Sequence, residues 1–226
     1  MSAALALRAP RQARSVESFR RMLDAAEAVM EEKSFDEATI GEVVERAGLT
    51  VGAFYSRFAD KEALLSCLEE RMAAEVSANA DTIDGALRAG EPVEAVLRRF
   101  LAGLVRFYHR RRAIARALVL RSHSDPELRA RLEKLNHRNM LKVSRFLAAR
   151  APRGRAAGPH ALEFALLAMR CVLRETVLFH ETFPGRRPLT EEELTEQLTR
   201  LVLAHLGLAA RIGARPAPGR KKGTPS

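Results

Sequence analysis

The chain has 226 residues, enough for one large domain or two small ones with a buried core. Hydrophobic residues make up 47% of it and charged residues 29%, an ordinary globular balance that argues against a fibrous or largely disordered protein. The formal net charge is +10, yet residues 1–74 hold 10 basic and 13 acidic side chains. The excess positive charge therefore lies elsewhere, and charge alone does not make the N-terminal part a nucleic-acid binder.

Three further features limit the class of protein. No apolar run approaches the ~20 residues that a membrane-spanning helix needs. The first residues are apolar before their arginines rather than after them, which is the reverse of a signal peptide. The two cysteines, Cys67 and Cys171, favour a reducing compartment over a disulfide framework. We therefore expect a cytoplasmic protein with no membrane partner, and an all-α fold because alternating β-branched patterns are scarce.

The chain begins with a basic segment, residues 1–14, which contains Arg8, Arg11 and Arg14 and no acid. We expect a disordered arm here. It is either a plain unstructured terminus or an arm that neutralises phosphates or enters a minor groove. From about Ser15 to Lys33 an apolar stripe of helical spacing predicts the first helix.

The stretch from Ala38 to Leu65 predicts three short helices separated by tight turns. Thr39 with Glu42 forms a capping-box pattern, and Gly48 suits a helix end that needs a left-handed residue. Thr50 is placed to cap the next helix and Asp60 the one after it. Two helices joined by a short glycine-containing turn are typical of a helix-turn-helix.

The run VVERAGLTVGAFYSRFADKEALL resembles the DNA-binding signature of the TetR family of transcriptional regulators. The resemblance covers roughly Ser18 to Glu75 in motif detail and the rest of the chain only in length and helical layout. It implies a helix-turn-helix DNA-binding domain over residues 15–75. It also implies a helical-bundle ligand-binding and dimerisation domain over residues 76–210, with about nine helices in all.

The resemblance also implies which residues meet DNA: Thr39, Thr50, Val51, Gly52, Ala53, Tyr55, Arg57 and Lys61. Tyr55 would pack on the sugar-phosphate chain, because Phe54 already fills the inward position. Lys61 would reach a phosphate as a point charge, and the alternative is a solvated lysine. For Thr39 and Thr50 a plain N-cap explains the residue as well. Val51 departs from the polar or basic residue that many family members carry, which puts the operator sequence in doubt.

The second half predicts further helices. One ends near Asn79, and a loop with Gly85, Gly90 and Pro92 precedes a long amphipathic helix. Others are expected from Asp125–Pro126 to about Arg150, and roughly over 160–183 and 190–206. The tail 211–226 is basic, poor in apolar residues and expected to be disordered.

Eight arginines and no acid lie between Glu94 and Asp125, which predicts either a solvated basic face or anchors for an acidic ligand. We expect a ligand pocket lined by aromatic, leucine and methionine side chains, although such residues are more often plain core: Phe100, Leu104, Phe107, Tyr108, Leu118 and Met169. The last two helices are apolar on more than one face, and in this family they commonly form the dimer interface. The residues assigned to it are Leu162, Leu166, Leu173, Val177, Leu198, Leu201 and Val202.

Motifs of catalysis are lacking: the sequence has no G-x-S-x-G, P-loop, G-x-G-x-x-G or HExxH, and its histidines are scattered. We therefore expect no enzyme, no cofactor and no metal site. The leading expectation is a homodimeric repressor that binds a palindromic double-stranded operator and is released by a small apolar or amphipathic inducer. The alternatives are a DNA-binding regulator or activator controlled by a partner protein and, more remotely, a helical small-molecule carrier or enzyme.

Overall fold

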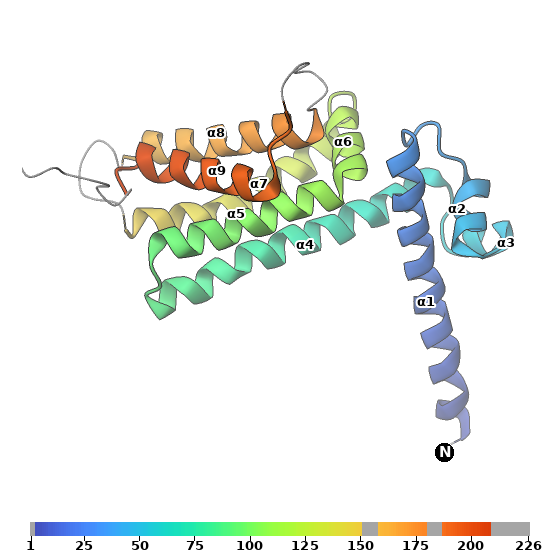
Figure 1. The fold of residues 1–226 in the computed structure, drawn as a ribbon. Coiled ribbons are helices and arrows are strands. Elements are labelled where there is room, and N and C mark those ends of the chain that lie inside the picture. Colours follow the sequence, from blue (N-terminus) through green and yellow to red (C-terminus); the bar gives the residue numbers. More distant parts are fainter. Residues whose placement is uncertain (1–2, 151–157, 180–186, 209–226) are drawn as a thin grey trace, which may run out of the picture.

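The computed structural model describes residues 3–150, 158–179 and 187–208. Within these residues the chain folds into nine α-helices without a strand, which confirms the all-α prediction (Figure 1). The helices are α1 Ala3–Glu32, α2 Ile40–Ala47, α3 Val51–Tyr55, α4 Lys61–Ala89, α5 Val93–Arg110, α6 Arg112–Arg121, α7 Pro126–Ala148, α8 Pro159–Leu178 and α9 Glu191–His205. None of them is long and apolar enough to cross a membrane.

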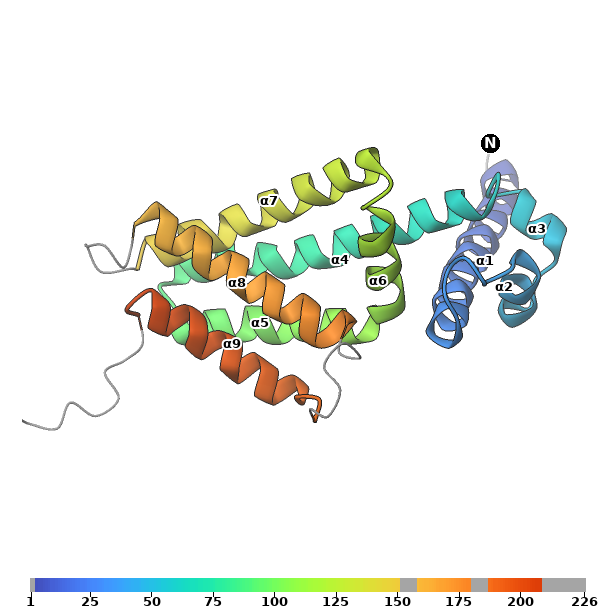
Figure 2. The ribbon, with the colours of Figure 1, turned by 90° about the horizontal axis from the view of Figure 1, so that it is seen from above.

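Helices α1 to α3 form an N-terminal unit at one end of the molecule, and α4 runs from it into the helical body made by α4 to α9 (Figures 1 and 2). The core of the N-terminal unit contains stacked aromatic rings. Phe58 lies with its ring centroid 5.6 Å from that of Phe19 and 5.1 Å from that of Phe54. Because α2 and α3 have only eight and five residues, they depend on this packing rather than on intrinsic helix stability.

The body is a bundle of longer helices. Helix α5 packs against α4, α8 and α9, whereas α7 packs against α4 and α8 (Figure 2). The short helix α6 contacts α1 as well as α8, so it joins the body to the N-terminal unit. The domain boundary expected near residue 75 falls inside α4, and the two parts therefore share one continuous helix.

Three expectations about the helices need correction. Helix α1 begins at Ala3, so the segment 1–14 is helical from residue 3 onward rather than an irregular arm; its alanines and leucines favour helix. Helix α4 continues past Asn79 to Ala89, because Gly85 is tolerated within it and only Gly90, with φ +68°, ends it. Helix α8 ends at Leu178, whereas the prediction reached 183. The predicted tail 211–226 lies outside the described residues.

Much of the basic stretch between Glu94 and Asp125 is neutralised inside the molecule. The Glu27 carboxylate of α1 forms ion pairs with Arg71 of α4 and with Arg111, the residue between α5 and α6. Arg111 also lies 3.3 Å from Glu75. Arg98, Arg99, Arg110 and Arg121 of this stretch also form ion pairs with carboxylates. The basic run therefore serves largely to join helices, and Arg111 connects α1, α4 and the α5–α6 junction.

Candidate DNA-binding surface and ligand cavities

Helix α2 begins with the predicted capping box. The Thr39 hydroxyl oxygen accepts the Glu42 N–H at 3.3 Å, while the Glu42 carboxylate accepts the Thr39 N–H at 2.9 Å. The same carboxylate accepts a hydrogen bond from the Lys33 ammonium at the end of the preceding segment. The Lys33 ammonium and then the Thr39 donors lower the pKa of Glu42 to about 2. The start of α2 is therefore fixed by a charged carboxylate at ordinary pH.

The turn between α2 and α3 requires a glycine. Gly48 has φ +61° and ψ +42°, the left-handed conformation that side chains disfavour. Its N–H donates to Glu45 O at 2.9 Å, and the Leu49 N–H donates to Val44 O at 2.8 Å. A Cβ atom at position 48 would also lie 2.7 Å from the Arg21 guanidinium, which donates to the Ala47 carbonyl. The angle between the two helices is thus set by local backbone geometry.

Helix α3 presents a largely exposed outward face. The Thr50 hydroxyl caps it by accepting the Ala53 N–H at 3.1 Å, and Phe54 anchors it with no exposed surface. On the opposite side Tyr55 is 57% exposed and Val51 49%, and Gly52 beside them is exposed as well. We name Thr50, Val51, Gly52 and Tyr55 the recognition face. Large side chains left in water on a short, well-anchored helix are available for a partner.

The structure gives Lys61 and Arg57 structural partners. The Lys61 ammonium donates to the carbonyls of Phe35, Asp36 and Ala38 at 2.9 to 3.0 Å and lies 4.7 Å from the Phe35 ring centroid. Arg57 donates to Ala53 O at 3.2 Å and to the Ser15 hydroxyl at 3.2 Å, which joins α3 to α1. Their predicted DNA contacts stay predictions, because a phosphate would have to compete with these bonds. Ala53 is half-buried, and Thr39 is exposed.

The six residues expected to line a ligand pocket belong mainly to the body's core. Phe100, Leu104, Phe107, Leu118 and Met169 are all at most 6% exposed and line none of the three hollows described below. Only Tyr108 lines such a hollow. Apolar side chains at helical spacing pack first against the neighbouring helices, and the contact of these six residues with a ligand stays a prediction.

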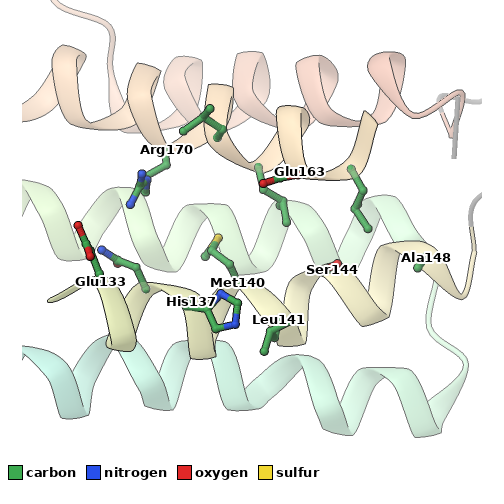
Figure 3. Close-up of a pocket in the computed structure, with 12 residues that line it drawn as sticks. Glu133, His137, Met140, Leu141, Ser144, Ala148, Glu163 and Arg170 are labelled. Carbon is green, nitrogen blue, oxygen red and sulfur yellow. The ribbon is translucent and has the colours of Figure 1, made fainter. Parts of the chain in front are cut away.

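Two hollows lie along α7 and α8, and residues of α5 and α6 also line the smaller one. The larger, of about 610 Å³, is lined by Glu133, Asn136, His137, Met140, Leu141, Ser144, Ala148, Leu162, Glu163, Leu166, Leu167 and Arg170 (Figure 3). The smaller, of about 280 Å³, is lined by Tyr108, Val119, Ser122, His123, Arg129, Leu132, Glu133, Asn136, Arg170, Cys171 and Arg174. Sequence periodicity could not reveal them, because they depend on how far apart two helices lie. A third hollow of about 560 Å³ lies beside Phe35, Leu120 and Arg121.

The residues assigned to the dimer interface are mostly buried within the chain. Leu162, Leu166, Leu173, Val177, Leu198 and Val202 are each at most 7% exposed, whereas Leu201 is 37% exposed. The large exposed apolar side chains of α8 and α9 are Leu201 and three that were not assigned to the interface: Phe164, Leu167 and Val172. Both helices carry two apolar stripes, and the sequence did not tell which stripe faces inward.

No group of three or more potential metal ligands occurs among the described residues.

A three-helix unit with a capped helix pair, a left-handed glycine turn and an exposed second helix has the arrangement of a helix-turn-helix DNA-binding domain, and here it is joined to a helical body. Residues 22–67 match the family model described as bacterial regulatory proteins, tetR family. The A-factor receptor protein of Streptomyces griseus is 36% identical over 66 residues, and the match covers 29% of this chain but only 24% of that protein.

The fold extends the likeness beyond the N-terminal unit. A TetR-family transcriptional regulator from Streptomyces coelicolor has a TM-score of 0.61 at 20% identity, covering 85% of this chain and 81% of that one. The regulator FadR from Bacillus subtilis, solved with stearoyl-CoA, has a TM-score of 0.60 at 13% identity, covering 85% of this chain and 100% of that one. This chain carries the TetR-family DNA-binding domain on the fold of TetR-family transcriptional regulators.

Proposed function

We propose that this chain is a cytoplasmic repressor that binds a palindromic operator as a homodimer through α2 and α3. The observation that carries the proposal is the recognition face, in which Val51, Gly52 and Tyr55 point outward while Phe54 holds the helix in place. In a helix-turn-helix the second helix enters the major groove, and its first residues meet base edges. The capped ends of neighbouring helices meet phosphates, which fix the orientation on the duplex.

The homodimer is supported by the exposed apolar side chains of α8 and α9. Phe164 is 59% exposed, and its ring lies 5.2 Å from that of His205, so the two helices share one outward surface. Covering this surface with a second copy would remove four large apolar side chains from water. A palindromic operator requires the two-fold axis of this dimer to place the two α3 helices about 34 Å apart, so that each enters the major groove of one half-site.

Control by a small molecule is the second part of the proposal. The similar regulator FadR was solved with stearoyl-CoA, and another relative is named as a receptor for A-factor. A ligand in the helical body releases the operator if it binds more tightly to a conformation whose α3 helices are wrongly spaced. A coupling free energy of ~1–3 kcal/mol between the two sites is typical of such control.

Footprinting on DNA upstream of the chain's own gene tests the proposal. An inverted repeat should be protected, and sedimentation of the free protein should give twice the chain mass of 25.0 kDa. We expect Tyr55→Ala to weaken operator binding about tenfold, which is about 1.4 kcal/mol. Leu120→Ala is the matched control, because Leu120 is similarly exposed at 53% but lies on α6. Both variants should keep the wild-type thermal unfolding.

Each outcome has a distinct meaning. Protection of no inverted repeat, or equal affinity for every duplex at physiological salt, would overturn the DNA-binding proposal. Normal binding by Tyr55→Ala would remove only the role of that residue. Native mass spectrometry separates the two forms of regulator, because a co-purified small molecule supports the ligand-controlled repressor. A co-purified protein would instead support control by a partner.

A further inference from the structure

The two hollows between α7 and α8 are parts of one seam. Both are lined by Glu133, Asn136 and Arg170, so the smaller hollow begins where the larger one ends. The helices run antiparallel here, with Ala148 opposite the start of α8 and Glu133 opposite Arg170 (Figure 3). A ligand lying along the seam would therefore touch both parts.

The two ends of the seam differ in chemistry. Half of the residues that line the larger hollow are apolar: Met140, Leu141, Ala148, Leu162, Leu166 and Leu167. The smaller hollow holds three arginines, Arg129, Arg170 and Arg174, against the single carboxylate of Glu133. The seam thus passes from an apolar end to a cationic end over a short distance.

The cationic end has unused capacity to bind an anion. Whereas Arg98, Arg99 and Arg131 are paired with carboxylates, Arg129 and Arg170 make no ion pair within the described ranges of the chain. Arg174 lies 3.3 Å from its neighbour Glu175. Figure 3 shows the Arg170 side chain reaching from α8 towards α7, over the hollow. A guanidinium in this position can form a bidentate bond to a carboxylate or phosphate.

A half-buried tyrosine adds a hydrogen-bond donor beside these arginines. Tyr108 of α5 lines the same hollow. Burial raises the pKa of its hydroxyl, and the charges of Arg170 and Arg174, which line the same hollow, act in the opposite direction. The hydroxyl is therefore protonated at neutral pH and can donate to an oxyanion.

We propose that the α7–α8 seam binds a single-chain amphipath with an anionic headgroup, the head between Arg170, Arg129 and Tyr108 and the chain along Met140, Leu166 and Leu162. This rests on the proposed function and names the ligand class. From Arg170 to Leu162 is eight residues, so the apolar part is about 12 Å long. Glu163 lines the apolar end and opposes a second negative charge there, which fixes the ligand's direction.

Titration calorimetry on the full chain without DNA tests the site. The probes are decanoate, decan-1-ol and decylamine below their aggregation concentrations, since they share a chain and differ in head charge. We expect decanoate to bind about tenfold more tightly than decan-1-ol, and decylamine to bind least, as a charge-assisted hydrogen bond requires. Arg170→Gln should lower decanoate affinity about tenfold and leave decan-1-ol affinity unchanged. Arg145→Gln, an exposed arginine of α7 outside the seam, is the matched control.

Failure here is separable from failure of the proposed function. Equal binding of all three probes would show an apolar surface without anion selection and overturn the headgroup assignment. If none of the three probes binds, the proposed site is overturned, and this outcome also covers a dimer in which a second copy covers the seam. Operator footprinting would be unaffected. Decanoate that binds through Arg170 but leaves operator affinity unchanged would overturn the assignment of this class as the releasing ligand.

Discussion

The N-terminal unit and the helical body are stabilised in different ways. In the N-terminal unit, helices of eight and five residues are held by caps, by a left-handed glycine and by side chains that bind backbone carbonyls, as Lys61 and Arg57 do. In the body, helices of 15 or more residues pack by broad apolar faces. The short helices need specific local bonds because they are too short to be stable alone, whereas the long ones need only suitable faces.

This difference has a functional counterpart. A surface that must match DNA within a fraction of an ångström gains from bonds that fix each turn. A body that bound a ligand would gain from helix pairs that leave space between them, as α7 and α8 do along their seam. The three predictions that follow test whether the two parts behave so differently.

The largest effect is expected from removing a buried ring. Phe54→Ala in the N-terminal unit and Phe146→Ala in the body each delete a side chain that is at most 1% exposed. Each should cost about 3–5 kcal/mol of unfolding free energy. Hydrogen exchange, measured peptide by peptide, should show that Phe54→Ala lowers the protection of backbone amides in α2 and α3 and leaves that in α8 and α9 unchanged. Phe146→Ala should give the reverse pattern.

Equal loss of protection in both parts by either variant would mean that the molecule unfolds as one unit. The continuous helix α4 and the Arg111 ion pairs would then outweigh the difference in packing.

A smaller effect is expected at Lys61. Lys61→Gln removes an ammonium that donates to three backbone carbonyls, and it should lower the unfolding free energy by about 1–3 kcal/mol. Urea denaturation of the protein without DNA measures this. Lys134→Gln, at an exposed position of α7, is the control and should have no effect. If Lys61→Gln is as stable as the wild type but binds the operator weakly, the phosphate contact rather than the structural role is its main function.

The smallest effect is expected when the pH is lowered, and a second carboxyl of the same chain serves as the control. Glu42 of α2 and Glu193 of α9 both belong to capping boxes, and in each a cationic partner, Lys33 or Arg187, lowers the carboxyl pKa to about 2. The folded protein stabilises the charged form of each carboxyl. Each carboxyl's contribution to folding stability is therefore fully present above the ordinary pKa of 4.5 and is lost as the pH falls towards 2. A carbon-detected NMR titration should place both carboxyls well below 4.5.

In the same titration Lys33→Met should raise the pKa of Glu42 towards its ordinary value and leave that of Glu193 unchanged. A Glu42 pKa that does not move would mean that the Thr39 donors alone hold it down.

The sequence predicted the N-terminal unit well because its signals are local. The capping box of Thr39 and Glu42, the left-handed Gly48 and the Thr50 cap each depend on residues within a few positions of one another. The inward place of Phe54 and the outward place of Tyr55 were also predicted, because a five-residue helix has one inner side.

The body was harder because its contacts are between distant segments. Periodicity located α5, α7, α8 and α9, but α8 has two apolar stripes, and the stripe with Leu166 and Leu173 turned inward while Phe164 stayed exposed. The cationic end of the seam joins Tyr108, Arg129 and Arg170 from three helices. Their spacing along the chain carries no sign of that meeting. Arg111 likewise joins acids from α1 and α4, which only the tertiary fold brings together.

The single helix that the two parts share has a mechanical consequence. Helix α4 has 29 residues and is therefore about 43 Å long, with its first turn beneath the N-terminal unit and its last turn at the far end of the bundle. A stiff rod of that length magnifies movement: pivoting it by about five degrees shifts its other tip by on the order of 4 Å. A displacement near α7 that is too small to break a side-chain contact would thus become, at the other end of α4, a shift as large as the spacing between base pairs.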